Sequence, residues 1–334
     1  MISLREGGSR RPTRRGRGAT RHHWVRDALL AVVVCVVALL AVIVSTASGP
    51  GSAARHARPS APAAATAPPP PNTYGSVLAP PAQRVNARLN MPLSSGLLFD
   101  VRTGRVLWEQ DPHRVLAIAS LTKMMTALVV VAHARPGAQV LITSAATHFT
   151  GSGVGLLPQG KWVPLEPLLY GLLLPSGNDA AIALAQYVAG TQNRFIAMMN
   201  ARGQQMNLPC THFTSVSGIV DQGNHSCAGD LAVIAHAVLE QPVLAPIVAS
   251  RSAILPFPIK GGKLFLYNNN PLLVLGYPGT DGVKTGFTTI AGQCLVATAR
   301  RGATWLGVVL LHSADTSDQA QQLLNAGFAA EHAR

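Results

Sequence analysis

The sequence lacks the residue spacings that build metal sites in proteins. Its four cysteines include no Cys-x-x-Cys pair, and its eleven histidines include no His-Glu-x-x-His spacing. Zinc sites usually depend on such closely spaced ligands. The sequence therefore indicates no metal site, and nothing in it implies another cofactor.

Charged residues are scarce, at 12% of the 334 residues, and the positive charge is unevenly distributed. The formal net charge is +13, but eight arginines precede residue 27. Residues 48–334 contain 19 basic and 12 acidic residues, a net charge of only +7. A nucleic-acid-binding protein concentrates basic residues on the surface of its folded part. Nucleic acid is therefore not expected as a partner.

A long uncharged apolar segment, residues 28–47, follows this basic tail. About 20 apolar residues span the hydrocarbon layer of a bilayer, and arginines beside such a segment favour the cytoplasmic side. The pattern predicts a basic cytoplasmic tail at residues 1–27, a transmembrane anchor at residues 28–47 and export of the remainder. A cleaved signal peptide is the alternative, because Ser45, Thr46 and Ala47 offer small residues to a peptidase. The protein would then be secreted.

Residues 48–84 are rich in Ala, Pro, Gly and Ser, which predicts an extended linker because such a segment cannot bury a core. Residues 85–334 have the length of one folded domain. Within it, Cys210 and Cys227 could form a disulfide in an oxidising compartment, and the sequence leaves this open. Cys294 lies in a strand-like run and is expected to be a small buried side chain.

Hydrophobic patterning predicts strands at both ends of the domain and helices between them. A hairpin is expected from strands at residues 96–100 and 105–108. The expected helices cover residues 121–134, 165–174, 178–189, 195–206, 230–239 and 318–329. The remaining expected strands cover residues 282–288, 293–299 and 304–311. This order predicts an α+β fold in which one antiparallel sheet joins the two ends of the domain and helices pack against it.

Ser120 and Lys123 have the spacing of a serine nucleophile and a lysine base. They lie one turn apart at the start of a predicted helix, so both side chains face the same way. Apolar neighbours are expected to desolvate Lys123 and lower its pKa, as a general base requires. The chain has only five lysines against 22 arginines, and arginine cannot serve as a base. A helix-capping serine is the ordinary structural explanation for Ser120.

Two further motifs follow along the chain. Ser-Gly-Asn at residues 176–178 lies in the turn between two predicted helices, where a hydroxyl and an amide can point into a cleft. These residue types are also common helix caps. Lys-Thr-Gly at residues 284–286 lies on a predicted strand, where a cation and a hydroxyl can hold a carboxylate. An edge strand with a protective surface lysine is the alternative there.

Together the three motifs resemble the signature of penicillin-binding proteins and class A β-lactamases. The surrounding residues 118–126, 170–181 and 281–288 are similar, more narrowly, to the low-molecular-weight serine-type D-Ala-D-Ala carboxypeptidases. The resemblance covers about residues 90–330. It implies the β-lactamase/transpeptidase-like fold, with a five-stranded antiparallel sheet, packed helices and a mostly helical subdomain.

The resemblance also implies a role for each reactive residue. Ser120 would attack the carbonyl between two terminal D-alanines and form an acyl-enzyme, which water then releases. Lys123 would be the base, and Asn178 would orient its amine and the substrate amide. Ser176, steadied by Lys284, would relay a proton to the leaving D-alanine.

A second group of residues is implied to hold the substrate. Lys284 and Thr285 would bind the terminal carboxylate, and the N–H groups of Ser120 and Phe287 would form the oxyanion hole. Gly286 would let a substrate backbone approach closely. The implied substrates are peptidoglycan stem peptides ending in D-Ala-D-Ala, and β-lactams would acylate the same serine.

Other activities are known for proteins with these three motifs, and each needs particular residues in the sequence. A class A β-lactamase needs a glutamate that activates water, yet no carboxylate lies between Asp179 and Asp221, and Glu166 precedes the middle motif. A D,D-endopeptidase or transpeptidase differs only in acceptor or leaving group and stays open. A catalytically silent penicillin-binding wall protein would have lost a reactive residue, and all are present. The expected location is the bacterial cell membrane, with the catalytic domain outside.

Overall fold

The structure is a computed structural model of the chain and describes residues 73–135, 137–155 and 157–333. The predicted tail and the predicted anchor at residues 28–47 lie outside the described residues. In the part of the chain that is described, no helix combines the length and the apolar character needed to cross a membrane.

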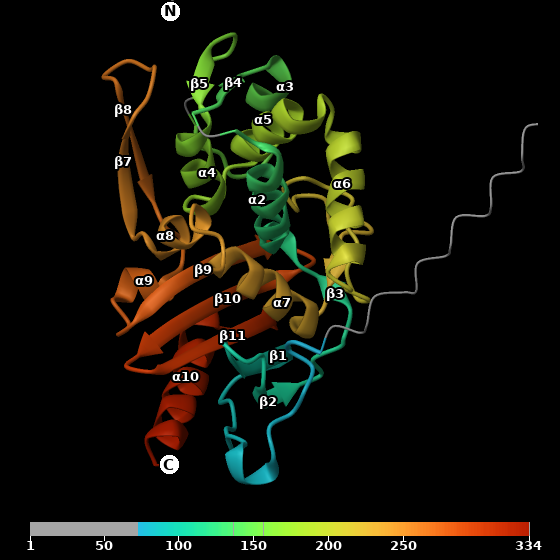
Figure 1. The fold of residues 1–334 in the computed structure, drawn as a ribbon, viewed down its shortest axis with the longest axis vertical. Coiled ribbons are helices and arrows are strands. Elements are labelled where there is room, and N and C mark those ends of the chain that lie inside the picture. The colour runs from blue at the N-terminus through green and yellow to red at the C-terminus, as the bar shows by residue number, and fades with distance from the viewer. Residues whose placement is uncertain (1–72, 136, 156, 334) are drawn as a thin grey trace, which may run out of the picture. The chain divides into compact units, whose positions relative to one another are not determined.

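A five-stranded antiparallel sheet forms the centre of the fold, with the strand order β2-β1-β11-β10-β9 (Figure 1). Its strands are β1 (Leu93–Asp100), β2 (Val106–Gln110), β9 (Thr280–Thr288), β10 (Gly292–Arg301) and β11 (Thr304–Ser313). β1 pairs directly with β11, where Leu97 lies opposite Val309. The sheet therefore joins the two ends of the domain, which confirms the predicted topology.

Both faces of this sheet are buried, which explains why β10 and β11 are almost continuously apolar. Successive side chains of a strand point to opposite faces, so Val308 lies in one hydrophobic cluster and Val309 in the other. α10 (Thr316–His332) covers the first face, and α7 (Ala228–Leu239) lies against the second. The predicted α+β fold is thus confirmed as a layered structure with helices on both sides.

The second cluster continues into a group of helices on one side of the sheet (Figure 1). The group consists of α2 (Thr122–His133), α3 (Ser144–Thr147), α4 (Leu165–Leu173), α5 (Asn178–Ala189) and α6 (Gln192–Gln205). Each predicted helix is present, with bounds that shift by at most three residues at either end. This group is the mostly helical subdomain that the resemblance implied.

Several short elements were not predicted. They are the 3-10 turns η1 (Pro81–Gln83) and η2 (Ala119–Leu121), the helices α3, α8 (Leu244–Ala249) and α9 (Pro271–Leu275), and three strand pairs. The pairs are β3 (Leu116–Ala117) with β6 (His225–Ser226), β4 (Gln139–Leu141) with β5 (Trp162–Pro164), and β7 (Ser252–Pro256) with β8 (Lys263–Tyr267). Elements this short carry too few residues for a recognisable period.

The packed chain begins earlier than predicted. The hydroxyl of Tyr74 donates to the carbonyl of Val101, and its ring stacks on His236. Leu78 forms a β-bridge with Val106. The end of the predicted linker at residues 48–84 is therefore part of the fold from residue 73 onward, because its few large side chains find partners on the domain.

Candidate active site

Ser120 lies in η2, the tight turn immediately before α2, rather than in the helix itself. The turn is held by a hydrogen bond from the N–H of Leu121 to the carbonyl of Ile118. Ala119 has a φ of 46°, a left-handed conformation that is uncommon for a residue with a side chain. The Ser120 side chain is partly exposed, as a nucleophile must be.

Lys123 is fully buried on the first turn of α2. Its Nζ lies 2.9 Å from Oγ of Ser120, 2.8 Å from Oδ1 of Asn178 and 2.7 Å from the carbonyl oxygen of Ser217. Two of these three partners can only accept a hydrogen bond. A neutral amine therefore gives its two N–H groups to Asn178 and Ser217 and turns its lone pair toward the Ser120 hydroxyl.

The electrostatic surroundings favour this neutral form. Burial lowers the pKa of Lys123 well below its usual range, the positive charge of Lys284 lowers it further, and Asp179 opposes the shift. Removing an amine from water disfavours its charged form. The contact and the lowered pKa of Lys123 are what a serine nucleophile and a lysine base would require.

Asn178 begins α5 and ties the amine to a neighbouring loop. Its Nδ2 donates to the carbonyl of Thr150 at 2.6 Å, and its backbone N–H donates to Ser152 at 2.8 Å. These bonds fix the side-chain oxygen toward Lys123. The next residue, Asp179, accepts from the N–H of Val154 at 2.8 Å and so holds the same loop, a role that the sequence did not reveal.

Ser176 has a φ of 69°, in the left-handed region. Its Oγ is buried and has no hydrogen-bond partner within the described part of the chain. An unpaired buried hydroxyl is costly, so its position beside a cleft indicates a partner supplied by substrate. Lys284, which was expected to steady Ser176, donates from Nζ to the carbonyl of Thr285 at 2.9 Å. No hydrogen bond joins the Lys284 and Ser176 side chains among the described residues.

Lys284 lies on β9, the edge strand of the central sheet, yet its side chain is only 1% exposed. A protective surface lysine would be solvated, so that alternative is wrong. Burial lowers the pKa of Lys284 to about 7. Near neutral pH the amine is therefore only partly protonated, and a nearby negative charge would stabilise its charged form.

Gly286 explains how β9 reaches the nucleophile. A Cβ at this position would lie 2.9 Å from the carbonyl oxygen of Ile118 and 3.1 Å from the backbone nitrogen of Ser120. The close approach predicted at this glycine thus comes from the protein's own nucleophile turn. Glycine lets strand and turn pack backbone against backbone.

These elements surround a cleft of about 480 Å³. Its lining includes the predicted residues Ser120, Ser176, Thr285, Gly286 and Phe287 and the unpredicted residues Ser152, Asn269, Gln293, Cys294 and Thr316. None of these side chains is formally charged. Asn269 also donates to the carbonyl of Pro175 at 3.2 Å, which joins the far wall of the cleft to the Ser176 turn.

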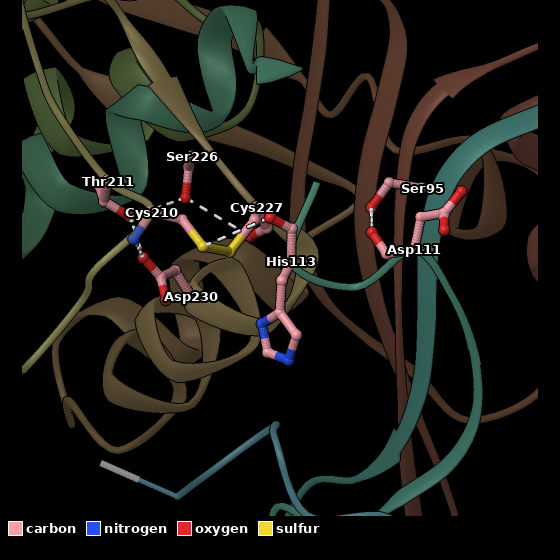
Figure 2. The surroundings of a disulfide bond; sticks show 8 residues. All are labelled: Ser95, Asp111, His113, Cys210, Thr211, Ser226, Cys227 and Asp230. Carbon is pink, nitrogen blue, oxygen red and sulfur yellow. Dashed lines mark hydrogen bonds between the residues drawn. A yellow bond between two sulfur atoms is a disulfide. The ribbon is translucent and has the colours of Figure 1, made fainter. Parts of the chain in front are cut away.

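A disulfide between Cys210 and Cys227 closes the loop that supplies the Ser217 carbonyl. Figure 2 shows Asp230 beside this bond, where its carboxylate accepts from the N–H of Cys210 at 2.8 Å and from the hydroxyl of Thr211 at 2.6 Å. Burial raises the pKa of Asp230. The question that the sequence left open is thus answered in favour of a disulfide, and Cys294 is free and buried as predicted.

The same loop is hydrogen-bonded to α2 at two more points. Asn224 Nδ2 donates to Oγ1 of Thr122 at 2.8 Å, and Oγ1 of Thr126 donates to the carbonyl of Val216 at 2.7 Å. Asp221 accepts from Oγ1 of Thr288 at 2.9 Å and so connects the loop to the end of β9. One loop therefore positions the base relative to the edge strand.

Neither Glu166, which precedes the middle motif, nor Asp221, the next acid after Asp179, lines the cleft that holds Ser120. Glu166 lies in the first turn of α4 and lines a separate cavity of about 530 Å³. Asp221 is bonded to Thr288 and does not line the cleft that holds Ser120. A glutamate placed to activate water for lactam hydrolysis is absent from the lining of this cleft.

A serine and a buried lysine, set between a helix start and the edge of an antiparallel sheet, define a protein of the β-lactamase/transpeptidase-like class. A D-alanyl-D-alanine carboxypeptidase structure from Mycobacterium tuberculosis H37Rv is similar, with a TM-score of 0.70 and 33% identity, covering 75% of this chain and 96% of that one. The DD-transpeptidase of Streptomyces K15 is similar with a TM-score of 0.68 and 31% identity, covering 73% of this chain and 100% of that one.

The chain belongs to the D-alanyl-D-alanine carboxypeptidase family, whose model matches residues 83–315. A D-alanyl-D-alanine carboxypeptidase of Bacillus subtilis (strain 168) is 32% identical over 213 residues, 62% of this chain and 54% of the relative. One from Mycobacterium tuberculosis is 35% identical over 246 residues, 71% of this chain and 83% of the relative. The family resemblance is confirmed. The chain spans little more than half the length of the Bacillus relative.

Proposed function

We propose that this protein is a penicillin-sensitive serine D-Ala-D-Ala carboxypeptidase that removes the terminal D-alanine from peptidoglycan stem peptides. The observation that carries this proposal is the contact of Lys123 with Ser120, in which two acceptors take the amine's N–H groups. That arrangement leaves a lone pair for the serine proton. Family membership supplies the substrate class.

The first step forms the acyl-enzyme. Lys123 accepts the proton of Ser120 as Oγ attacks the carbonyl carbon between the two D-alanines. A positioned base at hydrogen-bond distance is the geometry that such a step needs. The negative charge on the carbonyl oxygen is stabilised by the backbone N–H groups of Ser120 and Phe287, which lie where the nucleophile turn meets β9.

The second step breaks the peptide bond. The leaving D-alanine nitrogen needs a proton, and Ser176 has a buried Oγ that no described residue engages. Ser176 relays this proton from Lys123, and Lys284 favours the transfer through its charge rather than through a direct bond. Water then attacks the acyl carbon and releases the shortened peptide.

Substrate binding uses the edge of the sheet. An exposed edge strand can pair with an extended peptide through its backbone groups, and β9 is such an edge. Thr285 lines the cleft and offers a hydroxyl to the terminal carboxylate. The buried Lys284 amine behind it supplies the positive charge.

Release of free D-alanine from a pentapeptide ending in D-Ala-D-Ala tests the proposal. The wild type is expected to release D-alanine and to be labelled covalently by penicillin, and Ser120→Ala is expected to do neither. Ser144→Ala, a change of an exposed serine on α3, is the matched control and should behave as wild type. Labelling of Ser120→Ala at the wild-type rate would refute the assignment.

A D,D-transpeptidase or endopeptidase acting on cross-links is the second candidate. The likeness to the Streptomyces K15 DD-transpeptidase over the full length of that chain favours it. Partitioning of the acyl-enzyme between water and an added amine acceptor separates the activities. Mostly hydrolysis supports the carboxypeptidase, and mostly aminolysis supports the transpeptidase.

We also propose that residues 28–47 anchor the protein in the bacterial cell membrane, with residues 1–27 in the cytoplasm, residues 48–72 as a linker and the catalytic domain outside. The basic tail and the uncharged segment after it support this orientation. Protease treatment of intact spheroplasts should digest the domain. Mass spectrometry of the mature N-terminus distinguishes the anchor from a cleaved signal, which would give a secreted protein.

A further inference from the structure

The hairpin of β7 and β8 presents an unusual outward surface. Leu264 and Leu266 are only 2% and 3% exposed, so the inner face of the hairpin packs on the domain. Ile254, Phe265 and Tyr267 are 62%, 57% and 69% exposed. Ile254 lies opposite Phe265 in the strand register, and alternate residues of a strand share a face. These three side chains, here called the hairpin face, therefore form one surface.

The apolar surface continues onto the neighbouring helix. Val274 and Leu275 of α9 are 50% and 64% exposed. The Nη2 of Arg251, which precedes β7, donates to the carbonyl of Val274 at 2.7 Å. This bond places α9 beside the base of the hairpin. In Figure 1 the hairpin extends away from the central sheet, which leaves its outer side unobstructed.

The segment of chain that contains the hairpin carries charges of one sign only. Residues 241–280 contain no aspartate or glutamate and include three cations, Arg251, Lys260 and Lys263. All three are exposed. Lys263 lies opposite Pro256 in the register, on the outward side of the hairpin. Aromatic, aliphatic and basic side chains therefore occupy one surface together.

We propose that the hairpin face docks on the surface of an anionic lipid bilayer. Tyrosine and phenylalanine favour the boundary between headgroups and acyl chains, and clustered basic residues are attracted to anionic headgroups. A glycan strand fits less well, because residues 252–267 contain no carboxylate or amide side chain to bind sugar hydroxyls. Because residues 241–280 contain no acidic residue, the hairpin itself does not repel a negative surface.

Docking would also place the cleft close to the membrane. Asn269 lines the cleft and follows Tyr267 by two residues. Its side chain holds the turn that carries Ser176 through Pro175. The hairpin is thus directly continuous with one wall of the cleft, which suits a substrate presented at a bilayer surface.

Vesicle co-sedimentation of residues 67–334 tests the proposal. Ala67–Arg334 forms one compact unit that contains every described helix and strand, so it can be examined without the predicted anchor, which would itself bind lipid. The probes are vesicles of phosphatidylcholine alone and of phosphatidylcholine mixed with phosphatidylglycerol. Binding is expected only to the mixed vesicles, and added salt should weaken it.

Two double variants and a matched control locate the surface. Phe265→Ser with Tyr267→Ser, and Lys260→Glu with Lys263→Glu, are each expected to lower the partition coefficient by roughly tenfold or more. Val77→Ser with Arg102→Glu, which changes an exposed apolar residue and an exposed cation elsewhere, should bind as wild type. Unchanged penicillin labelling checks that each variant is folded.

Three results would overturn the proposal. The first is no binding of the wild type to anionic vesicles at low salt. The second is wild-type binding by both hairpin variants. The third is retention on purified cell walls instead of vesicles, lost in the same variants, which would assign the hairpin face to a wall polymer.

Discussion

The side-chain oxygen of Asn178 accepts a hydrogen bond from Nζ of Lys123 at 2.8 Å, deep inside the domain. The Nδ2 of the same amide is held by Thr150 at 2.6 Å, so the oxygen cannot turn away without breaking that bond. A neutral acceptor at this position orients the amine without stabilising its charge. An aspartate of the same size would stabilise the charge instead.

The substitution Asn178→Asp tests this relationship. A carboxylate next to a buried amine raises the pKa of the lysine, so Lys123 should stay protonated to higher pH. Penicillin acylation near neutral pH should fall roughly a hundredfold, and the acid limb of its pH profile should move to higher pH. Asn193→Asp, at an exposed position on α6, is the control, and an unmoved acid limb in Asn178→Asp would contradict the role of the amide.

Lys284 predicts how activity depends on alkaline pH. Burial lowers the pKa of its amine to about 7, so the positive charge is present below that pH and is lost as the pH rises above it. The kcat/KM for a peptide with a free terminal carboxylate should therefore fall above about 7. A substrate ending in D-alaninamide lacks the carboxylate, so its kcat/KM should not show this fall at alkaline pH. Identical profiles for the two substrates would exclude the carboxylate contact.

Gly286 should tolerate no side chain. In Gly286→Ala the new Cβ would lie 2.9 Å from the Ile118 carbonyl and 3.1 Å from the Ser120 nitrogen, so β9 or the nucleophile turn must shift. A displacement of about 1 Å can lower a reaction rate about a hundredfold, so the rate of acylation by penicillin should fall about a hundredfold. Gly203→Ala, where a Cβ meets nothing within 4 Å, should leave acylation unchanged and add about 1 kcal/mol of stability.

The disulfide predicts a linked loss of stability and activity. Replacing Cys210 and Cys227 together with serine should lower the free energy of unfolding by roughly 2–4 kcal/mol. Acylation should slow because the Ser217 carbonyl, which holds Lys123 at 2.7 Å, sits in the released loop. Denaturant unfolding and penicillin labelling measure the two effects. Dithiothreitol should affect the wild type but not the double variant, and equal sensitivity would point to another target.

The reactive residues could be predicted from the sequence because their chemistry restricts the choice of residue. Lysine, unlike arginine, can lose its proton, so a lysine one turn after Ser120 was informative. Hydrophobic periodicity located α5 at Asn178–Ala189 without error. Among the contacts of Lys123, the one that escaped prediction comes from the backbone. The Ser217 carbonyl binds Lys123 through an atom that every residue possesses, so no residue type signals it.

Two other differences have physical causes. Gly286 was expected to make room for substrate, but the structure places it against the η2 turn. The sequence had predicted the start of a helix, rather than a separate 3-10 turn, at this point. The β7–β8 hairpin was missed because its strands are apolar on both faces, so polar and apolar residues do not alternate along them. Hydrophobic patterning assumes that such side chains are buried, so a surface that is apolar on its outer side does not follow the expected pattern.

The pairing of Leu97 with Val309 has a consequence for the order of assembly. β1 leaves the ribosome long before its partner strand β11, because about 200 residues separate them in the sequence. Contacts so distant in sequence form late in folding, and β9 can be held against Ser120 only when β10 and β11 have joined the sheet. A nascent or truncated chain would therefore carry the serine and the lysine without their reactivity. The site would become competent to react only after β11 has been synthesised and has joined the sheet.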